Sequence, residues 1–324
     1  MKAIGGYFEL ELSEGSEYHK KAIALNSGRH CFEYILRLRN YQKVYIPYYT
    51  CEVILEPIKK LNLQYEYYHI NEKLEPHFDF SLLQENEAFL YTNYFGLKDK
   101  YINTLPSKHN IIIDNCQSFF SKPLPWFDTF YSPRKFFGVP DGGYLYTYDN
   151  SKLDLNLEQA TSYNRCSHLL KRIDFSAEKG YNDYKKNDSI ISSEPLMIMS
   201  NLTHRLLSSI DYNYCKVKRQ ENFIYFHRQL ENINLLNIDL MIGNKFIPMN
   251  YPLLIEKPYL RRKLINQKIF IPQYWENVFN WTKETDYEQY LTRYLIALPI
   301  DQRYGIKDKF KTNLFHIGFG DMKY

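Results

Sequence analysis

One lysine in this chain stands among residues suited to a chemical role. A lysine acts as a nucleophile when its amine is partly deprotonated, and both desolvation and a neighbouring positive charge lower its pKa. Lys135 follows Arg134, which would supply the charge, and we expect desolvation from the nearby aromatic residues Phe130, Phe136 and Phe137. A surface Lys-Arg pair after a strand is the plainer interpretation of the same residues.

A carboxylate follows three isoleucines upstream of this lysine. Asp114 ends the run 111–114. Aspartate is depleted in strands, and a buried carboxylate is costly unless it is paired. A protonated ring nitrogen of an aromatic cofactor would be a suitable partner. Lys135 and Asp114 together are therefore a candidate cofactor site, in which the lysine holds an aldehyde cofactor as a Schiff base and the carboxylate holds its ring nitrogen. The alternative is that Asp114 caps a helix after the strand.

The elements that would position these residues alternate between short strands and helices. Apolar, β-prone runs predict strands at 22–25, 43–47, 63–70, 88–92, 111–114, 126–131 and 143–147. This alternation is typical of βαβ units in a mostly parallel sheet, whose ligands bind at the carboxyl ends of the strands. Gly28, Asn93, Asp114 and the turn 132–135 all follow strand ends, so we expect them to converge on one side of the sheet.

The first of these turns has the features of an anion site. Asn26, Ser27 and Gly28 separate a short apolar strand from a helix, and either Asn26 or Ser27 is a good N-cap. Such a turn directs free backbone N–H groups and the positive end of the helix dipole toward whatever lies in front of it. An ordinary capped helix start explains the same residues.

The remaining segments predict a large domain at 1–240 and a small α/β domain at 241–324. Residues 7–12 alternate as a half-buried strand does, and 150–195 is polar and is expected to form a long irregular excursion toward a partner subunit. Residues 195–235 have a helical pattern. The small domain is expected to contain strands at 246–249, 251–255, 269–272 and 297–300 and a helix at 260–266.

Composition excludes several other classes of protein. Of 324 residues 44% are hydrophobic, which is enough for a sizeable core, and 41 basic against 37 acidic residues do not favour nucleic-acid binding. Five cysteines without a CxxC spacing argue against a disulfide framework or a zinc site, so we expect no metal and a reducing cytoplasm. The N-terminus lacks the apolar region of a signal peptide, and no run of about 18 apolar residues predicts a membrane span.

Four short motifs, in a fixed order along the chain, are shared with one enzyme family. They are Ser27-Gly28-Arg29, Asp114-Asn115-Cys116-Gln117, Ser132-Pro133-Arg134-Lys135 followed by Gly142-Gly143, and Gly180-Tyr181-Asn182. In these motifs the chain resembles the DegT/DnrJ/EryC1/StrS aminotransferases, which are pyridoxal-phosphate sugar aminotransferases of the aspartate-aminotransferase fold (fold type I). The resemblance runs from about residue 20 to 150 and returns more loosely at the C-terminus.

The resemblance implies a fold and a set of site residues. The fold is a three-layer α/β/α large domain with a mostly parallel seven-stranded sheet, plus a small C-terminal α/β domain. Lys135 would be the catalytic lysine, Asp114 would hold the pyridine nitrogen of pyridoxal 5'-phosphate, and Gln117 would lie beside that cofactor. The remaining cofactor-binding residues would be Ser27, Gly28, Arg29, Ser132 and, across the interface of a homodimer, Asn182.

Some positions depart from the family pattern. Ser132 lies three residues before the lysine rather than the usual five, and Arg29 replaces a threonine. The aromatic that stacks on the cofactor in many members falls near Cys51, where Tyr49 is the candidate substitute. The Asp, Gln and Lys persist, so the cofactor is expected to persist, whereas the phosphate cup and the substrate side are rebuilt.

The activity that the resemblance implies is transfer of an amino group from an amino acid, L-glutamate in most of the family, to a keto-sugar nucleotide in surface-polysaccharide or deoxysugar biosynthesis. Partners would then be small molecules and a second copy of the chain. One alternative is a sugar dehydratase of the same fold, but those relatives carry histidine where Lys135 stands. Another is a degenerate binding protein without catalysis.

Overall fold

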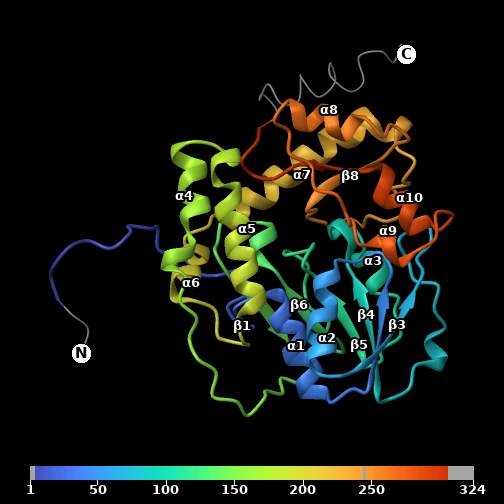
Figure 1. Cartoon of the computed structure of the whole chain (residues 1–324), viewed down its shortest axis with the longest axis horizontal. Helices are drawn as coiled ribbons and strands as arrows, with labels where there is room; N and C mark the ends of the chain where they lie inside the picture. The colour runs from blue at the N-terminus through green and yellow to red at the C-terminus, as the bar shows by residue number, and fades with distance from the viewer. Residues whose placement is uncertain (1–3, 244–245, 306–324) are drawn as a thin grey trace.

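The computed structural model describes residues 4–243 and 246–305 and is organised around a seven-stranded sheet (Figure 1). The strand order is β1-β7-β6-β5-β4-β2-β3. β2 to β6 are mutually parallel where they pair, and β7 runs antiparallel to both β6 and β1. The strands are β1 (Ile23–Leu25), β2 (Lys43–Pro47), β3 (Gln64–Tyr68), β4 (Glu87–Thr92), β5 (Ile111–Asp114), β6 (Asp128–Tyr131) and β7 (Gly143–Tyr146).

The two faces of the sheet bury alternate residues of its strands, as the period of two requires. Leu90, Ile112 and Phe130 face one core, which α1 (Gly28–Arg39) and α2 (Leu55–Lys60) cover. Their sequence neighbours face a second core, which includes buried residues of α7 (Tyr212–Leu230). The structure therefore has the predicted α/β fold, with a mostly parallel sheet between layers of helices.

Four buried tyrosines of the second core donate their phenol hydroxyls to main-chain carbonyls. The pairs are Tyr68 to Leu90 at 2.7 Å, Tyr91 to Leu74 at 2.9 Å, Tyr94 to Tyr49 at 2.9 Å and Tyr131 to Ser121 at 3.0 Å. A buried phenol needs such a partner because an unsatisfied polar group in a core is costly. These bonds tie the strands and the loops at their ends together.

The segment predicted to be an irregular excursion is largely helical. Residues 151–162 lack regular structure, but α4 (Ser167–Asp174) and α5 (Ala177–Ser193) form a hairpin that lies beside the sheet in Figure 1. Ser176 caps α5, and a Cβ on Gly180 would lie 2.8 Å from the carbonyl oxygen of His168. Gly180 thus allows the two helices to pack closely. The prediction failed for α5 because this helix is mostly polar, buries few residues and lacks the apolar stripe by which a helix is predicted from sequence.

The C-terminal part contains fewer strands than predicted. α6 (Asn201–Ser208) and α7 are followed by β8 (Asn250–Leu254), α8 (Leu260–Asn266), α9 (Val278–Trp281), α10 (Tyr287–Tyr294) and β9 (Leu295–Pro299). β8 and β9 form an antiparallel pair. Residues 246–249 and 269–272 are not strands, although Ile269 and Ile271 are buried, so apolar alternation there reflects packing without a ladder. The domain division at 240/241 stays a prediction, and residues 306–324 of the predicted small domain lie outside the described part.

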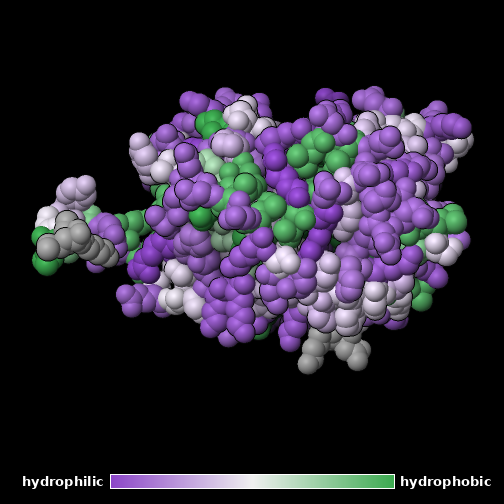
Figure 2. All heavy atoms as spheres, turned by 90° about the horizontal axis from the view of Figure 1, so that it is seen from below, coloured by the Kyte–Doolittle hydropathy of each residue, from purple (hydrophilic) through white to green (hydrophobic). Residues whose placement is uncertain are grey.

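The N-terminal segment is extended but unpaired. Residues 7–12 form no strand, and Tyr7 is 99% exposed, so the predicted half-buried strand is wrong. Figure 2 shows this arm, with hydrophobic side chains, projecting from a surface that is mostly hydrophilic. Among the described residues no helix is both long and apolar enough to cross a membrane.

Candidate active site

Lys135 ends a single helical turn that follows β6. Ser132 precedes this 3₁₀ turn, η4 (Pro133–Lys135), and Pro133 at its first position fixes the backbone. The carbonyl of Phe136 accepts hydrogen bonds from Gln302 at 3.0 Å and from Arg219 at 3.4 Å, which hold the turn from behind. The Lys135 side chain is exposed to solvent although protein surrounds it. The lysine is therefore open to solvent at the carboxyl ends of the strands.

Asp114 lies at the carboxyl end of the adjacent strand. β5 pairs with β6 so that Asp114 is opposite Phe130, five residues before Lys135. Asp114 is 9% exposed, and its carboxylate accepts a hydrogen bond from the Cys116 backbone N–H at 2.8 Å. It caps a turn rather than a helix, which leaves its side chain at the edge of the sheet where ligands of such folds bind.

The amine of Lys135 interacts with a set of nearby acidic groups. Burial acts to lower its pKa, but Cys116, Asp114, Tyr274 and Cys51 raise it, and the net shift is upward. Burial raises the pKa of the Cys116 thiol well above its usual value and that of Tyr274 to about 12. The Cys116 thiol and the Tyr274 phenol are therefore uncharged at neutral pH.

The expected lowering of the Lys135 pKa is thus wrong for the protein chain alone. Phe130 packs in the core under α1, and Phe136 and Phe137 pack in the opposite core. Arg134 forms an ion pair with Asp188 of α5 at 3.1 Å, which offsets its charge. These residues are near the lysine in the sequence, but their side chains pack in the two cores or pair with Asp188.

The turn before α1 lies against the Lys135 turn. Ser27 caps α1, since its Oγ accepts from the His30 N–H at 3.2 Å and lies 2.9 Å from Nδ1 of the same residue. A Cβ on Gly28 would lie 2.8 Å from Sγ of Cys116 and 3.5 Å from Cβ of Ser132. The structure therefore brings Ser27, Gly28 and Ser132 together beside the Asp114 turn.

Arg29 and Gln117 present buried donors without acceptors. Nε and Nη1 of Arg29 have no hydrogen-bond partner among the described residues, although Nη1 lies 2.9 Å from Oε2 of Glu56. Gln117 is 1% exposed; its Oε1 accepts from the Phe95 N–H at 2.7 Å, while its Nε2 is unpaired. Orphaned buried donors are rare in folded proteins, so both side chains fit a ligand that carries acceptor atoms.

Two predicted positions are placed differently. Asn182 is exposed on α5. It makes no described contact with the other predicted site residues, so its role across a dimer interface stays a prediction. Tyr49 is fully buried, with its ring 4.9 Å from that of Trp275, and is not available to stack on a ligand beside Lys135. Cys51 instead interacts with both Lys135 and Arg29.

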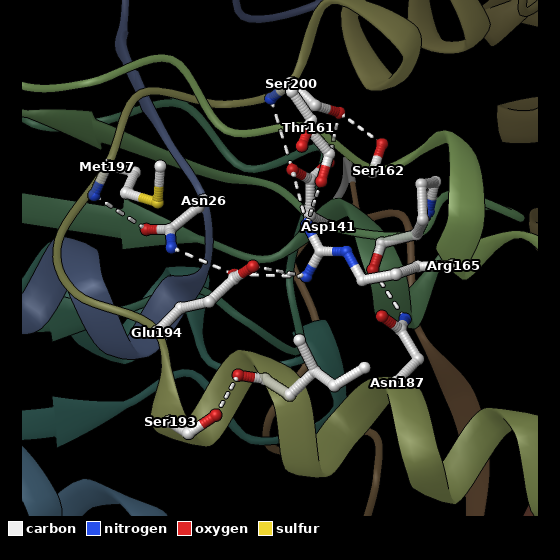
Figure 3. Close-up of polar contacts among 12 residues, drawn as sticks. Asn26, Asp141, Thr161, Ser162, Arg165, Asn187, Ser193, Glu194, Met197 and Ser200 are labelled. Atoms are coloured by element: carbon white, nitrogen blue, oxygen red, sulfur yellow. Dashed lines mark hydrogen bonds and ion pairs between the residues drawn. The ribbon is translucent and has the colours of Figure 1, made fainter.

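A buried polar network, which sequence reasoning missed, supports this site (Figure 3). Arg165 lies between Glu194 at 3.0 Å and Asp141 at 3.7 Å, and Asp141 also accepts from Ser200. Asn26, beside the α1 cap, donates to Glu194 at 3.4 Å. The network joins the α4–α5 hairpin to the α1 cap. The one sequence signal for this network is Asp141, a carboxylate directly before Gly142.

Two cavities lie away from these residues. One of about 460 Å³ is lined by residues of β3 and the start of α10, including Tyr67 and Tyr287, and one of about 840 Å³ is lined by Asp99, Asn115 and Lys216 among others. Neither is lined by Lys135 or Asp114. The candidate site is therefore located by the chemistry of its side chains and not by the size of a cavity.

The architecture of this chain is similar to that of solved sugar aminotransferase structures. CalS13, a sugar aminotransferase from Micromonospora echinospora, matches with a TM-score of 0.63 and 14% identity over 93% of this chain and 88% of that chain. A DegT DnrJ EryC1 StrS aminotransferase from Brucella abortus matches at 0.57 and 12% over 92% and 85%. NtdA from Bacillus subtilis with bound cofactor PMP matches at 0.60 and 14% over 91% and 73%.

These structures confirm the predicted resemblance at the level of the fold. No protein-family model matches the chain, and no curated protein does.

Proposed function

We propose that this chain is a pyridoxal-phosphate-dependent aminotransferase. It would transfer an amino group from an amino acid, L-glutamate, to a keto-sugar nucleotide in surface-polysaccharide or deoxysugar biosynthesis. The observation that carries the proposal is that Lys135 on η4 is exposed to solvent and lies within electrostatic reach of Asp114 at the end of β5. The fold of the aminotransferase structures supports the same function.

The residues around this pair fit the cofactor. Asp114 would hold the ring nitrogen, and the unpaired donors of Gln117 and Arg29 would meet its oxygen atoms. Ser27, Gly28 and Ser132 would surround its phosphate, and Asn182 of a second copy would reach it in a homodimer in the cytoplasm. Pyridoxal phosphate, when bound, supplies an electron sink for the carbanion at the substrate Cα.

The charges assign a sequence of roles to the protein groups. The acidic groups around Lys135, the Asp114 carboxylate among them, favour its ammonium form, which cannot act as a base. Pairing of the Asp114 carboxylate with a protonated ring nitrogen would neutralise that charge and lower the pKa of the amine. Lys135 would then act first as the nucleophile that holds the aldehyde and later as the general base that moves the proton at Cα.

The visible absorption spectrum tests this proposal. Purified protein is incubated with pyridoxal phosphate, then with L-glutamate, in parallel with Lys135→Ala. We expect a visible band that bleaches with glutamate and that the variant lacks, and borohydride reduction should attach the cofactor mass to the peptide containing Lys135. Absence of a band in the wild type would refute the enzyme proposal and favour a degenerate binding protein, for which Cys51 in place of a stacking aromatic is the supporting observation.

The environment of His30 does not favour the dehydratase alternative. His30 lies close to the α1 cap, but its two ring nitrogens pair with Ser27 Oγ at 2.9 Å and the Glu194 carbonyl at 3.1 Å. Burial lowers its pKa to about 4, so it is neutral and structural at neutral pH.

A further inference from the structure

Two arginines near Lys135 are each paired with a carboxylate that is more exposed than the arginine. Arg29 of α1 is 11% exposed and lies 2.9 Å from Glu56 of α2, which is 43% exposed. Arg134 of η4 is 16% exposed and lies 3.1 Å from Asp188 of α5, which is 49% exposed. In both pairs the fold fixes the cation, and the anion is the side chain that is free to move toward solvent.

Glu56 is an incomplete partner for Arg29. Its Oε2 comes within ion-pair distance of Nη1, yet neither Nη1 nor Nε has a hydrogen-bond acceptor among residues 4–243 and 246–305. Buried guanidinium donors prefer charged, bidentate acceptors such as carboxylate or phosphate oxygens. Arg29 therefore retains the capacity to bind an anion that aligns better than Glu56 does.

The two carboxylates also oppose one another. Burial raises the pKa of Glu56 even though Arg29 acts to lower it, and the negative charges of Asp188 and Glu52 raise it further. Both ion pairs flank the groups around the lysine: Arg134 precedes Lys135 in the same turn, and Arg29 and Lys135 both act on the Cys51 thiol. Removing either acid from its arginine would relieve this repulsion.

We propose that Glu56 and Asp188 are displaceable placeholders and that Arg29 and Arg134 bind the phosphate groups of a ligand when these carboxylates turn away. The inference rests on the proposed function, in which both the cofactor and the nucleotide-linked acceptor carry phosphate. A pair of partly exposed charges holds together only weakly. A phosphate group offers more acceptor oxygens and a greater negative charge, so it displaces the carboxylate.

This arrangement predicts an affinity change of unusual sign. Glu56→Gln and Asp188→Asn remove a competitor of the ligand, so phosphate-bearing ligands should bind more tightly by about threefold or more. Arg29→Gln and Arg134→Gln should weaken binding by about tenfold. A gain in affinity cannot result from misfolding, which keeps the test informative even if an arginine variant is unstable.

Matched controls separate displacement from a general change of charge. Glu52→Gln removes the same charge one turn from Glu56, and Glu52 has no arginine partner among the described ion pairs. Asp183→Asn removes a charge from α5, where Asp183 pairs with Lys171 at 2.7 Å. Both controls should change affinity by less than about twofold.

Two probes distinguish the source of the phosphate. Titration of the full chain with pyridoxal phosphate, against pyridoxal as the ligand without phosphate, reports on the cofactor. Calorimetric titration with uridine diphosphate reports on the acceptor. Tighter binding of either phosphate ligand by Glu56→Gln or Asp188→Asn, with pyridoxal unaffected, supports the proposal and assigns the arginine to that ligand.

The same affinities for these variants as for their controls would overturn the proposal. A chain that binds uridine diphosphate more tightly after Glu56→Gln, but gives no visible band with pyridoxal phosphate, would refute the proposed function and leave the placeholder inference standing. If the wild type forms the band but the acid variants bind phosphate ligands no more tightly than their controls, the proposed function is supported and the placeholder inference is refuted.

Discussion

Replacement of Arg165 by methionine removes the central charge of the network that joins the α4–α5 hairpin to the sheet. The Arg165 side chain is 3% exposed and Asp141 is fully buried, so water cannot replace the lost partner. Besides its two ion pairs, the guanidinium donates to the Thr161 carbonyl at 3.0 Å. Loss of one partner of a buried pair costs about 3–5 kcal/mol because it leaves a buried charge uncompensated.

The lower end of that range applies here. Asp141 keeps hydrogen bonds from the N–H and hydroxyl of Ser200 and from Thr203, and Glu194 is 20% exposed and can be hydrated. We therefore expect Arg165→Met to lower the free energy of unfolding by about 3 kcal/mol. Asp141→Asn in the same background should cost less than it does alone, because the two changes remove one interaction.

Urea unfolding followed by tryptophan fluorescence measures this loss. Arg172→Met is the matched control: it removes the same side chain from an exposed position of α4 and should change stability by about 0.5 kcal/mol or less. A loss below about 1 kcal/mol for Arg165→Met, or one equal to that of the control, would show that the reasoning about buried charge is wrong.

Two other changes are expected to act through backbone packing and through buried histidines. A Cβ on Gly143 would lie 2.4 Å from the carbonyl carbon and oxygen of Ser27, so Gly143→Ala should lower the free energy of unfolding by at least about 3 kcal/mol or prevent folding. Gly138→Ala is the control, because its Cβ would meet Leu169 at 3.5 Å, and it should be tolerated in the same urea assay. Burial lowers the pKa values of His19 and His30 to about 4 in the folded state. The unfolded chain therefore binds more protons between pH 6.5 and 4, and each histidine should remove about 2 kcal/mol of stability as pH falls from 7 to 5. His30→Gln should flatten that dependence in urea titrations at the two pH values; an unchanged slope would contradict the assignment.

The sheet could be predicted because its strands are short apolar runs separated by turn residues. The run 111–114 becomes β5 with the same limits, and the strand ends bring Gly28, Ser132 and the Asp114 turn together as parallel topology requires. Helix α5 could not be predicted, since its contacts depend on Gly180 fitting against a carbonyl of α4 and not on an apolar stripe.

The ion pairs of the site could not be predicted from the sequence for a different reason. Arg134 is adjacent to Lys135 in the chain, but its partner Asp188 is 54 residues away and offsets the charge of Arg134. Arg29 was predicted to bind the cofactor from its position in the motif alone, whereas its pairing with Glu56 depends on the packing of α1 against α2. Side-chain partners separated by long loops leave no local pattern.

The tyrosine hydroxyls of the second core have a consequence for how the two faces of the sheet tolerate change. The face under α1 and α2 is mostly aliphatic, so substitutions there need mainly to conserve volume. On the opposite face an exchange of Tyr91 or Tyr131 for phenylalanine conserves volume yet leaves a carbonyl without its donor. Because a hydrogen bond has direction, that face specifies the orientation of its loops as well as the shape of its core.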